Sequence, residues 1–116
     1  MHLSDVEEDL LGELAQDSHQ LWEVYTFVRF HNLWMSDDEV VTYGRKLIAN
    51  WLNRRWLQAV KSRIESSPLT ATAVLATVDK LGKGALDPYR ATMLFELSRQ
   101  AFDDVPWLSK SYTPPK

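Results

Sequence analysis

The chain has 116 residues, 45% hydrophobic and 25% charged, which is an ordinary composition for a globular protein of one domain. The absence of cysteine excludes disulfides, a thiol nucleophile and thiolate metal sites. No apolar run reaches the roughly 18 residues of a membrane span, and the acidic start is unlike a secretory signal, so we expect a single cytoplasmic domain over 1–116 with no membrane partner.

The net charge of −3 is unevenly distributed along the chain. Residues 1–39 hold ten acids and one base, whereas residues 40–63 hold six bases and no acid. One interpretation is that acids gather at helix starts and bases near helix ends, where they complement the helix dipoles. The other interpretation is a bipolar surface that is used for recognition. The first is the default, because ordinary helical proteins show the same pattern.

Two helices are predicted in the first 30 residues. Ser4 is a suitable N-cap for the first, and a turn at 16–18 ends it. The apolar residues between them have helical spacing: Val6, Leu10, Leu11 and Leu14. A second helix with a wide apolar face is expected from His19 to Phe30. The connection His31–Met35 carries three large apolar groups, so we expect it to fold back onto the core.

The clearest pattern is a helix from Ser36 to Asn53. Ser36 and Glu39 have the spacing of a capping box at its start. Its apolar face is formed by Val40, Gly44, Leu47, Ile48 and Trp51. The helix ends near Asn53-Arg54-Arg55, and Trp56–Val60, which is rich in strand formers, is predicted to be a strand.

The C-terminal half alternates between the two kinds of element. Ser67 with Pro68 predicts the start of a helix that ends near Gly82, and Lys83–Pro88 is expected to be a loop. Alternating apolar residues favour a strand from Arg90 to Leu97, although Asp87-Pro88 would also start a helix. Ser98 then caps a short helix through Asp104. The tail from Pro106 is predicted to be extended, with Trp107 and Leu108 docked and residues 113–116 disordered.

These elements together predict an α+β fold that is mostly helical. The layout resembles that of the winged-helix family: a three-helix core, a small sheet of two or three strands, and here a helical insertion between the last strands. The resemblance is carried by the capped helix Ser36–Asn53, the turn Asn53-Arg54-Arg55, the strand Trp56–Val60 and the strand-to-helix join FELSRQAF, Phe95–Phe102. It departs from the family between the last two strands, where some thirty residues replace a short hairpin wing.

The winged-helix resemblance implies one of two candidate functions, a DNA-binding transcriptional regulator whose helix 36–53 enters the major groove. The residues for DNA contact would be Thr42, Arg45, Lys46, Asn53, Arg54 and Arg55. Its weakness is the acidity of the chain, because acids near DNA repel the phosphate backbone.

The other candidate, which we favour, is a small non-catalytic protein-binding module of the immunity, adaptor or antitoxin-like type. It would use acidic and aromatic surface to bind a protein partner. The candidate residues are Glu7, Glu8, Glu13, Trp34, Trp56 and Trp107. Trp34, Trp56 and Trp107 are candidates for partial exposure, with a place in the core as the default for each. The sequence leaves monomer and homodimer open.

Catalytic and metal-binding motifs are missing from the sequence. It contains no nucleophile elbow, no P-loop and no dinucleotide-binding glycine motif. His19 and Glu23 are one helical turn apart, but no third ligand is evident, and an exposed pair of this kind is far commoner than a metal site. We therefore expect no enzyme activity, no metal and no cofactor.

Overall fold

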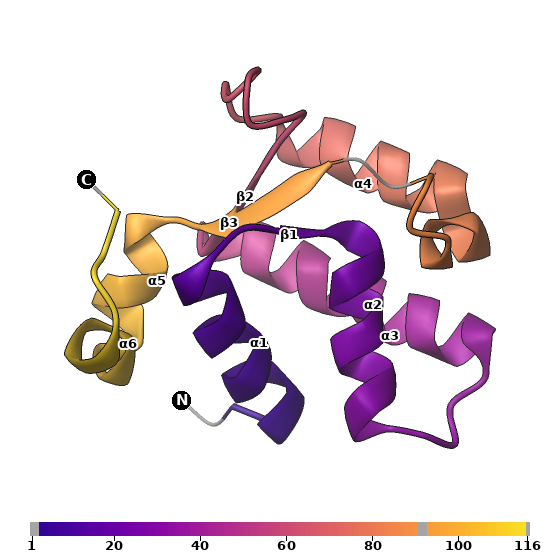
Figure 1. Cartoon of the computed structure of the whole chain (residues 1–116), viewed down its shortest axis with the longest axis horizontal. Coiled ribbons are helices and arrows are strands. Elements are labelled where there is room, and N and C mark those ends of the chain that lie inside the picture. Colours follow the sequence, from indigo (N-terminus) through magenta and orange to yellow (C-terminus); the bar gives the residue numbers. More distant parts are fainter. Residues whose placement is uncertain (1–2, 91–92, 116) are drawn as a thin grey trace.

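The structure is a computed structural model that describes residues 3–90 and 93–115. Along the chain the elements are α1 (Asp5–Gln16), β1 (His19–Gln20), α2 (Leu21–His31), α3 (Asp37–Asn53), β2 (Leu57–Val60), α4 (Ala71–Leu81), the 3₁₀ helix η1 (Gly82–Leu86), β3 (Leu94–Leu97), α5 (Arg99–Asp104) and α6 (Pro106–Ser111). In the view of Figure 1, α1 and α2 lie below the strands, α4 lies above them, and α5 and α6 lie to the left. Within the described residues, no helix combines the length and apolar character that crossing a membrane requires.

The first and third helices begin where the sequence predicts, because both have complete capping boxes. Ser4 accepts from the amide of Glu7 at 3.3 Å, and the Glu7 carboxylate accepts from the Ser4 amide. Ser36 and Glu39 make the same reciprocal pair at the start of α3. The Ser36 hydrogen bonds lower the pKa of the Glu39 carboxyl. Each box satisfies amides that the helix itself leaves without a partner.

The sheet is antiparallel, with the strand order β1-β3-β2. Leu57 pairs with Leu97 and Ala59 with Phe95, and all four side chains are buried. On the other side of this pair, Gln58 donates to Glu96 at 2.9 Å. The alternation that predicted a strand near Leu97 therefore marks its buried face.

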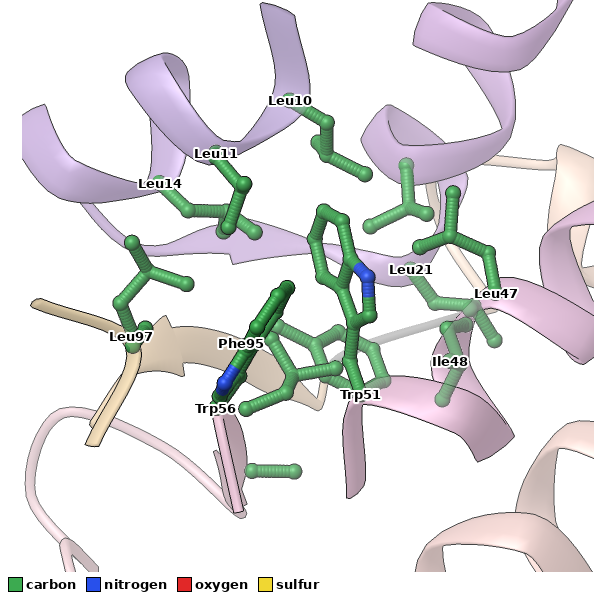
Figure 2. Packing of buried hydrophobic residues seen from close by; sticks show 14 of the residues in the cluster. Leu10, Leu11, Leu14, Leu21, Leu47, Ile48, Trp51, Trp56, Phe95 and Leu97 are labelled. Carbon is green, nitrogen blue, oxygen red and sulfur yellow. The ribbon is translucent and has the colours of Figure 1, made fainter. Parts of the chain in front are cut away.

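The core is centred on Trp51 of α3, which is fully buried. Figure 2 shows its ring reaching towards Leu10 of α1, with Trp56 and Phe95 on one side and Leu47 and Ile48 on the other. The Trp51 and Trp56 rings are 6.2 Å apart, centroid to centroid. The Trp51 side chain thus packs α3 against both α1 and the sheet, although these elements are distant in sequence.

Helices α2 and α3 approach closely at Gly44. A Cβ atom at this position would lie 2.5 Å from Cε1 of Tyr25, so only glycine leaves room for the ring. Tyr25 is fully buried, and its hydroxyl has no hydrogen-bond partner among the described residues. Burial, followed by the nearby Asp79 carboxylate, raises the pKa of Tyr25 to about 12, against the opposing effect of Arg45.

Several expectations for the N-terminal half are wrong in detail. Helix α2 begins at Leu21 rather than His19, because His19–Gln20 forms strand β1, with His19 opposite Phe95. The extended Gln20 then acts as the N-cap, and Glu23 completes a capping box with it. Trp56 immediately precedes β2 instead of starting it, and its amide donates to the Trp51 carbonyl at 2.9 Å.

The C-terminal half differs more. Helix α4 is capped by Thr70 rather than Ser67, because Pro68 forms a bridge with Val60 that holds the chain extended. The predicted loop after Gly82 contains η1. Strand β3 begins at Leu94; Arg90 lies in a turn, and residues 91–92 of the predicted strand lie outside the described residues. The tail predicted as extended from Pro106 forms helix α6, which starts with proline at its first position and buries Leu108.

The architecture is thus α+β and mostly helical, and α4 with η1 forms the expected helical insertion between β2 and β3. The element order and the sheet order are consistent with the winged-helix layout. In the tail predicted to be disordered, Thr113 and Pro115 line a shallow hollow together with residues of α1 and β3, and Lys116 lies outside the described residues.

Candidate protein-binding surface

The end of α2 and the connection that follows it carry three strongly exposed apolar side chains. Phe30, Leu33 and Trp34 are 71%, 72% and 91% exposed. The expectation that this connection folds back onto the core is wrong for Leu33 and Trp34; only Met35 packs against the core. A place in the core, the default for Trp34, is therefore wrong, and the alternative of exposure holds.

Hydrogen bonds hold this connection in one conformation. The Asn32 side chain donates to the carbonyl of Val28 at 3.1 Å, which ends α2 tightly. Arg29 donates to the Met35 carbonyl at 3.2 Å and forms an ion pair with Asp37. The side chains of Arg29 and Asn32 therefore bond the backbone, and those of Leu33 and Trp34 are exposed to solvent.

The outer face of α1 is acidic. Asp5, Glu8 and Asp9 are spaced by three and four residues and lie on this face, opposite the buried leucines. Glu7 has a different role, because its carboxylate caps the helix and accepts from Nε1 of the buried Trp51 at 3.4 Å. Glu13 is half-buried farther along α1. Of the three predicted glutamates, only Glu8 belongs to the exposed acidic face.

Trp107 extends this face from the other end of the chain. It is 36% exposed, and with Asp5, Glu8 and Asp9 it lines a shallow hollow between α6 and α1. Helix formation by the tail brings it there, since Leu108 is buried and the neighbouring Trp107 is directed to the surface.

The acidic face and the apolar connection meet at His31. Its Nε2 is 2.9 Å from Oδ2 of Asp9, and its ring packs edge-on against Phe30, with centroids 5.5 Å apart. We call the continuous surface formed by Asp5, Glu8, Asp9, Phe30, Leu33, Trp34 and Trp107 the acidic-aromatic edge. In Figure 1 its elements follow one another along the lower side of the molecule, from α6 past the start of α1 to the α2–α3 connection.

Trp56, the remaining predicted binding residue, does not lie on this edge. The default for it, a place in the core, is confirmed, and its alternative role as a partly exposed binding residue is wrong, because the side chain is fully buried. Its Nε1 donates to Asp104 of α5 at 2.7 Å, and the guanidinium of Arg54 lies 4.9 Å from the ring centroid. The indole thus fixes α5 against the end of α3.

The inserted helix α4 engages one of the residues predicted for DNA contact, and the others stay exposed. Helix α4 lies against α3, and Arg45 donates to both carboxylate oxygens of Asp79, at 3.0 and 3.3 Å. This pairing raises the pKa of Arg45 and lowers that of Asp79. The residues that stay exposed on the outer side or at the end of α3 are Thr42, Lys46, Asn53, Arg54 and Arg55. Arg55 has a positive φ of 62°, and its carbonyl accepts from the Ser98 hydroxyl.

His19 and Glu23 are adjacent, as their spacing predicts, with Nδ1 and Oε2 2.8 Å apart. Glu23 also accepts from the Gln20 amide at 2.9 Å, so this carboxylate serves the start of α2. The described residues contain no group of three side chains suited to holding a metal ion.

Sequence reasoning missed Phe30 and Leu33 as surface residues. The signal that identifies them is their position: Phe30 lies in the last turn of α2, and Leu33 lies in the short turn before the capping box of α3, where not every side chain can be buried. No family model, curated protein or solved structure matches this chain in the comparisons that we made.

Proposed function

We propose that the protein is a small non-catalytic protein-binding module and that it binds through the acidic-aromatic edge. The observation that carries this proposal is the joint exposure of Phe30, at the end of α2, and of Leu33 and Trp34 on the hydrogen-bonded connection that follows it. Contiguous exposed apolar surface of this kind marks interaction sites, and tryptophan is enriched among the residues that dominate binding energy. A preformed connection also reduces the conformational entropy lost on binding.

The charges around the apolar connection suggest what the partner carries. Asp5, Glu8 and Asp9 lie on one side of it, and the exposed first turn of α3 lies on the other, with Asp37, Asp38 and Glu39. Acids around an apolar centre favour a partner with an apolar anchor and a basic rim, because opposite charges steer association. Modules of the immunity, adaptor or antitoxin-like type would use such a surface to mask a basic protein.

Site-specific photo-crosslinking tests the proposal. With benzoylphenylalanine in place of Trp34, irradiation of cells that make the full chain should give one discrete, heavier adduct that contains a basic protein. Tyr89 is the matched control position, because it is 92% exposed but lies in the turn after η1, away from the acidic-aromatic edge. Placing the probe there should give no such adduct.

Two further results bear on the proposal. The Trp34 adduct should disappear when Phe30→Ser and Leu33→Ser are added, whereas Ile64→Ser, at a position 94% exposed, should leave it unchanged. Equal adducts at Trp34 and Tyr89, or an adduct insensitive to the Phe30 and Leu33 changes, would count against the acidic-aromatic edge as the binding surface.

DNA binding is the alternative, favoured by the exposed Thr42, Lys46 and Asn53 on one face of α3. Against it, Arg45 is paired with Asp79, and the hairpin wing is replaced by α4 and η1. We expect no sequence-specific duplex binding at physiological salt in a fluorescence titration with genomic fragments, because Arg45 is already paired and the acids of the chain repel the phosphate backbone. Sub-micromolar, salt-sensitive binding that is lost in the Arg45→Ala, Lys46→Ala double variant would overturn this expectation.

A further inference from the structure

A second surface lies on the opposite side of the molecule from the acidic-aromatic edge. It is a groove that α4 lines together with Lys61 and Leu69 after β2 and with Arg90 and Met93. Helix α4 lies at the upper side of the molecule in Figure 1. It contributes one ridge to the groove, formed by Ala73, Thr77, Lys80 and Leu81 at spacings of four, three and one. The volume of the groove is about 500 Å³, within the range of small-molecule sites.

The floor of this groove is apolar. Leu69, Leu81 and Met93 contribute large side chains to it, and Ala73 contributes a methyl group. The Thr77 hydroxyl donates to the Ala73 carbonyl within α4 at 3.0 Å, so it is not available as a donor to a ligand. Val74 and Val78 of α4 are buried, whereas Leu69 and Leu81 pack only partly against the core, so part of their apolar surface lies open along the groove.

The rim of the groove carries only positive charge. Lys61, Lys80 and Arg90 line it, and none of the described lining residues is acidic. Lys61 and Arg90 have acidic neighbours outside the groove, at 3.8 Å from Glu65 and 3.6 Å from Asp87, and these pairs are solvent-exposed and long. Lys80 forms no ion pair with another described residue. An anionic group could therefore bind there without displacing a short ion pair.

We propose that this groove binds an amphipathic anion, a small molecule with one carboxylate and an unbranched alkyl chain. The alkyl chain would lie along the ridge from Ala73 to Leu81, which spans about 12 Å at the helical rise. Its carboxylate would be held by the cations of the rim. The apolar floor contributes affinity by removing the chain from water, and the charges select an acid over an alcohol or an ammonium ion.

Methyl NMR of methionine tests this proposal, because Met93 is in the groove and Met35 is in the α2–α3 connection. With the full chain labelled at its methionine methyls, octanoate should shift the Met93 signal saturably, with a Kd on the order of 0.1–1 mM for a ligand of this size. The Met35 signal should stay in place, and Met93→Leu identifies the Met93 signal. Octanol, octyltrimethylammonium and acetate should each bind at least about tenfold more weakly. Octanol is uncharged, octyltrimethylammonium is a cation, and acetate lacks the long alkyl chain.

Variants separate the two parts of the site. Lys80→Gln should weaken octanoate binding about fivefold or more, whereas Lys110→Gln, on the exposed side of α6, should leave it unchanged. Ala73→Glu, at an exposed position that α4 tolerates, should abolish binding by placing a carboxylate on the floor. The proposal is overturned if octanoate gives no saturable shift, if octanol or octyltrimethylammonium binds as well as octanoate, or if Lys80→Gln and Lys110→Gln behave alike.

Discussion

Replacing Trp51 by alanine is expected to lower the free energy of unfolding by about 3–5 kcal/mol, the range for truncating a large buried aromatic residue. The side chain is fully buried and contacts α1, α3 and the sheet side of the core. Its removal would leave a cavity that the surrounding elements cannot fill by moving together. The Glu7 carboxylate would also lose the indole N–H that it accepts from at 3.4 Å. Urea unfolding of the variant beside the original protein measures the difference.

Trp34→Ala is the matched control for this experiment, since Trp34 is 91% exposed. Its free energy of unfolding should stay within about 0.5 kcal/mol of the original. Equal effects of the two substitutions would show that Trp51 is not the centre of the core.

Gly44→Ala is expected to destabilise the protein by about 1–3 kcal/mol, the usual effect of overpacking a core. The direction is informative because alanine in a helix is ordinarily favoured over glycine by about 1 kcal/mol. At Gly44 the added Cβ would lie 2.5 Å from Cε1 and 2.6 Å from Cδ1 of Tyr25, and the ring is fully buried, so α2 and α3 must separate. Thermal and urea unfolding both measure the change.

Gly12→Ala, in the middle of α1, is the control for Gly44→Ala. A Cβ there would lie 3.4 Å from the Tyr112 hydroxyl, an ordinary contact, so this substitution should be neutral or stabilising. Tyr25→Leu should lessen the effect of Gly44→Ala when the two are combined, because the ring that causes the clash is gone. If Gly44→Ala stabilises the protein as much as Gly12→Ala, the close approach of α2 and α3 is not present.

The elements that could be predicted from the sequence are those whose information is local. The N-cap at Ser4, the capping box at Ser36 and the apolar face of α3 lie within one helix each, and the structure confirms them. Strand β1 could not be predicted, because two residues have no periodicity and their conformation depends on Phe95. Helix α6 was missed for a related reason: it is one short helix, and burial of Leu108 against distant residues stabilises it.

The candidate surface was predictable only in part. Trp34 and the acids of α1 are visible in the sequence, but their connection through His31 and Asp9 depends on the packing of α1 against α2. Trp56 shows the opposite difficulty: its neighbouring arginines made partial exposure an alternative to the core, and only the fold shows that its indole donates to Asp104. Tertiary contacts, rather than residue type, decide which tryptophans face solvent.

The position of β3 in the middle of the sheet has a consequence for how the nascent chain folds. Of the three strands it is synthesised last, yet it is the one to which both others pair. At about 5–20 residues per second, α1, α2 and α3 leave the ribosome a few seconds before Leu97 does. During that interval β1 and β2 have no strand to pair with, and the apolar faces of the helices have no complete core to enter. A chaperone that binds the nascent chain would therefore bind helices that are not yet packed on a sheet. Folding is completed only after most of the chain has been synthesised.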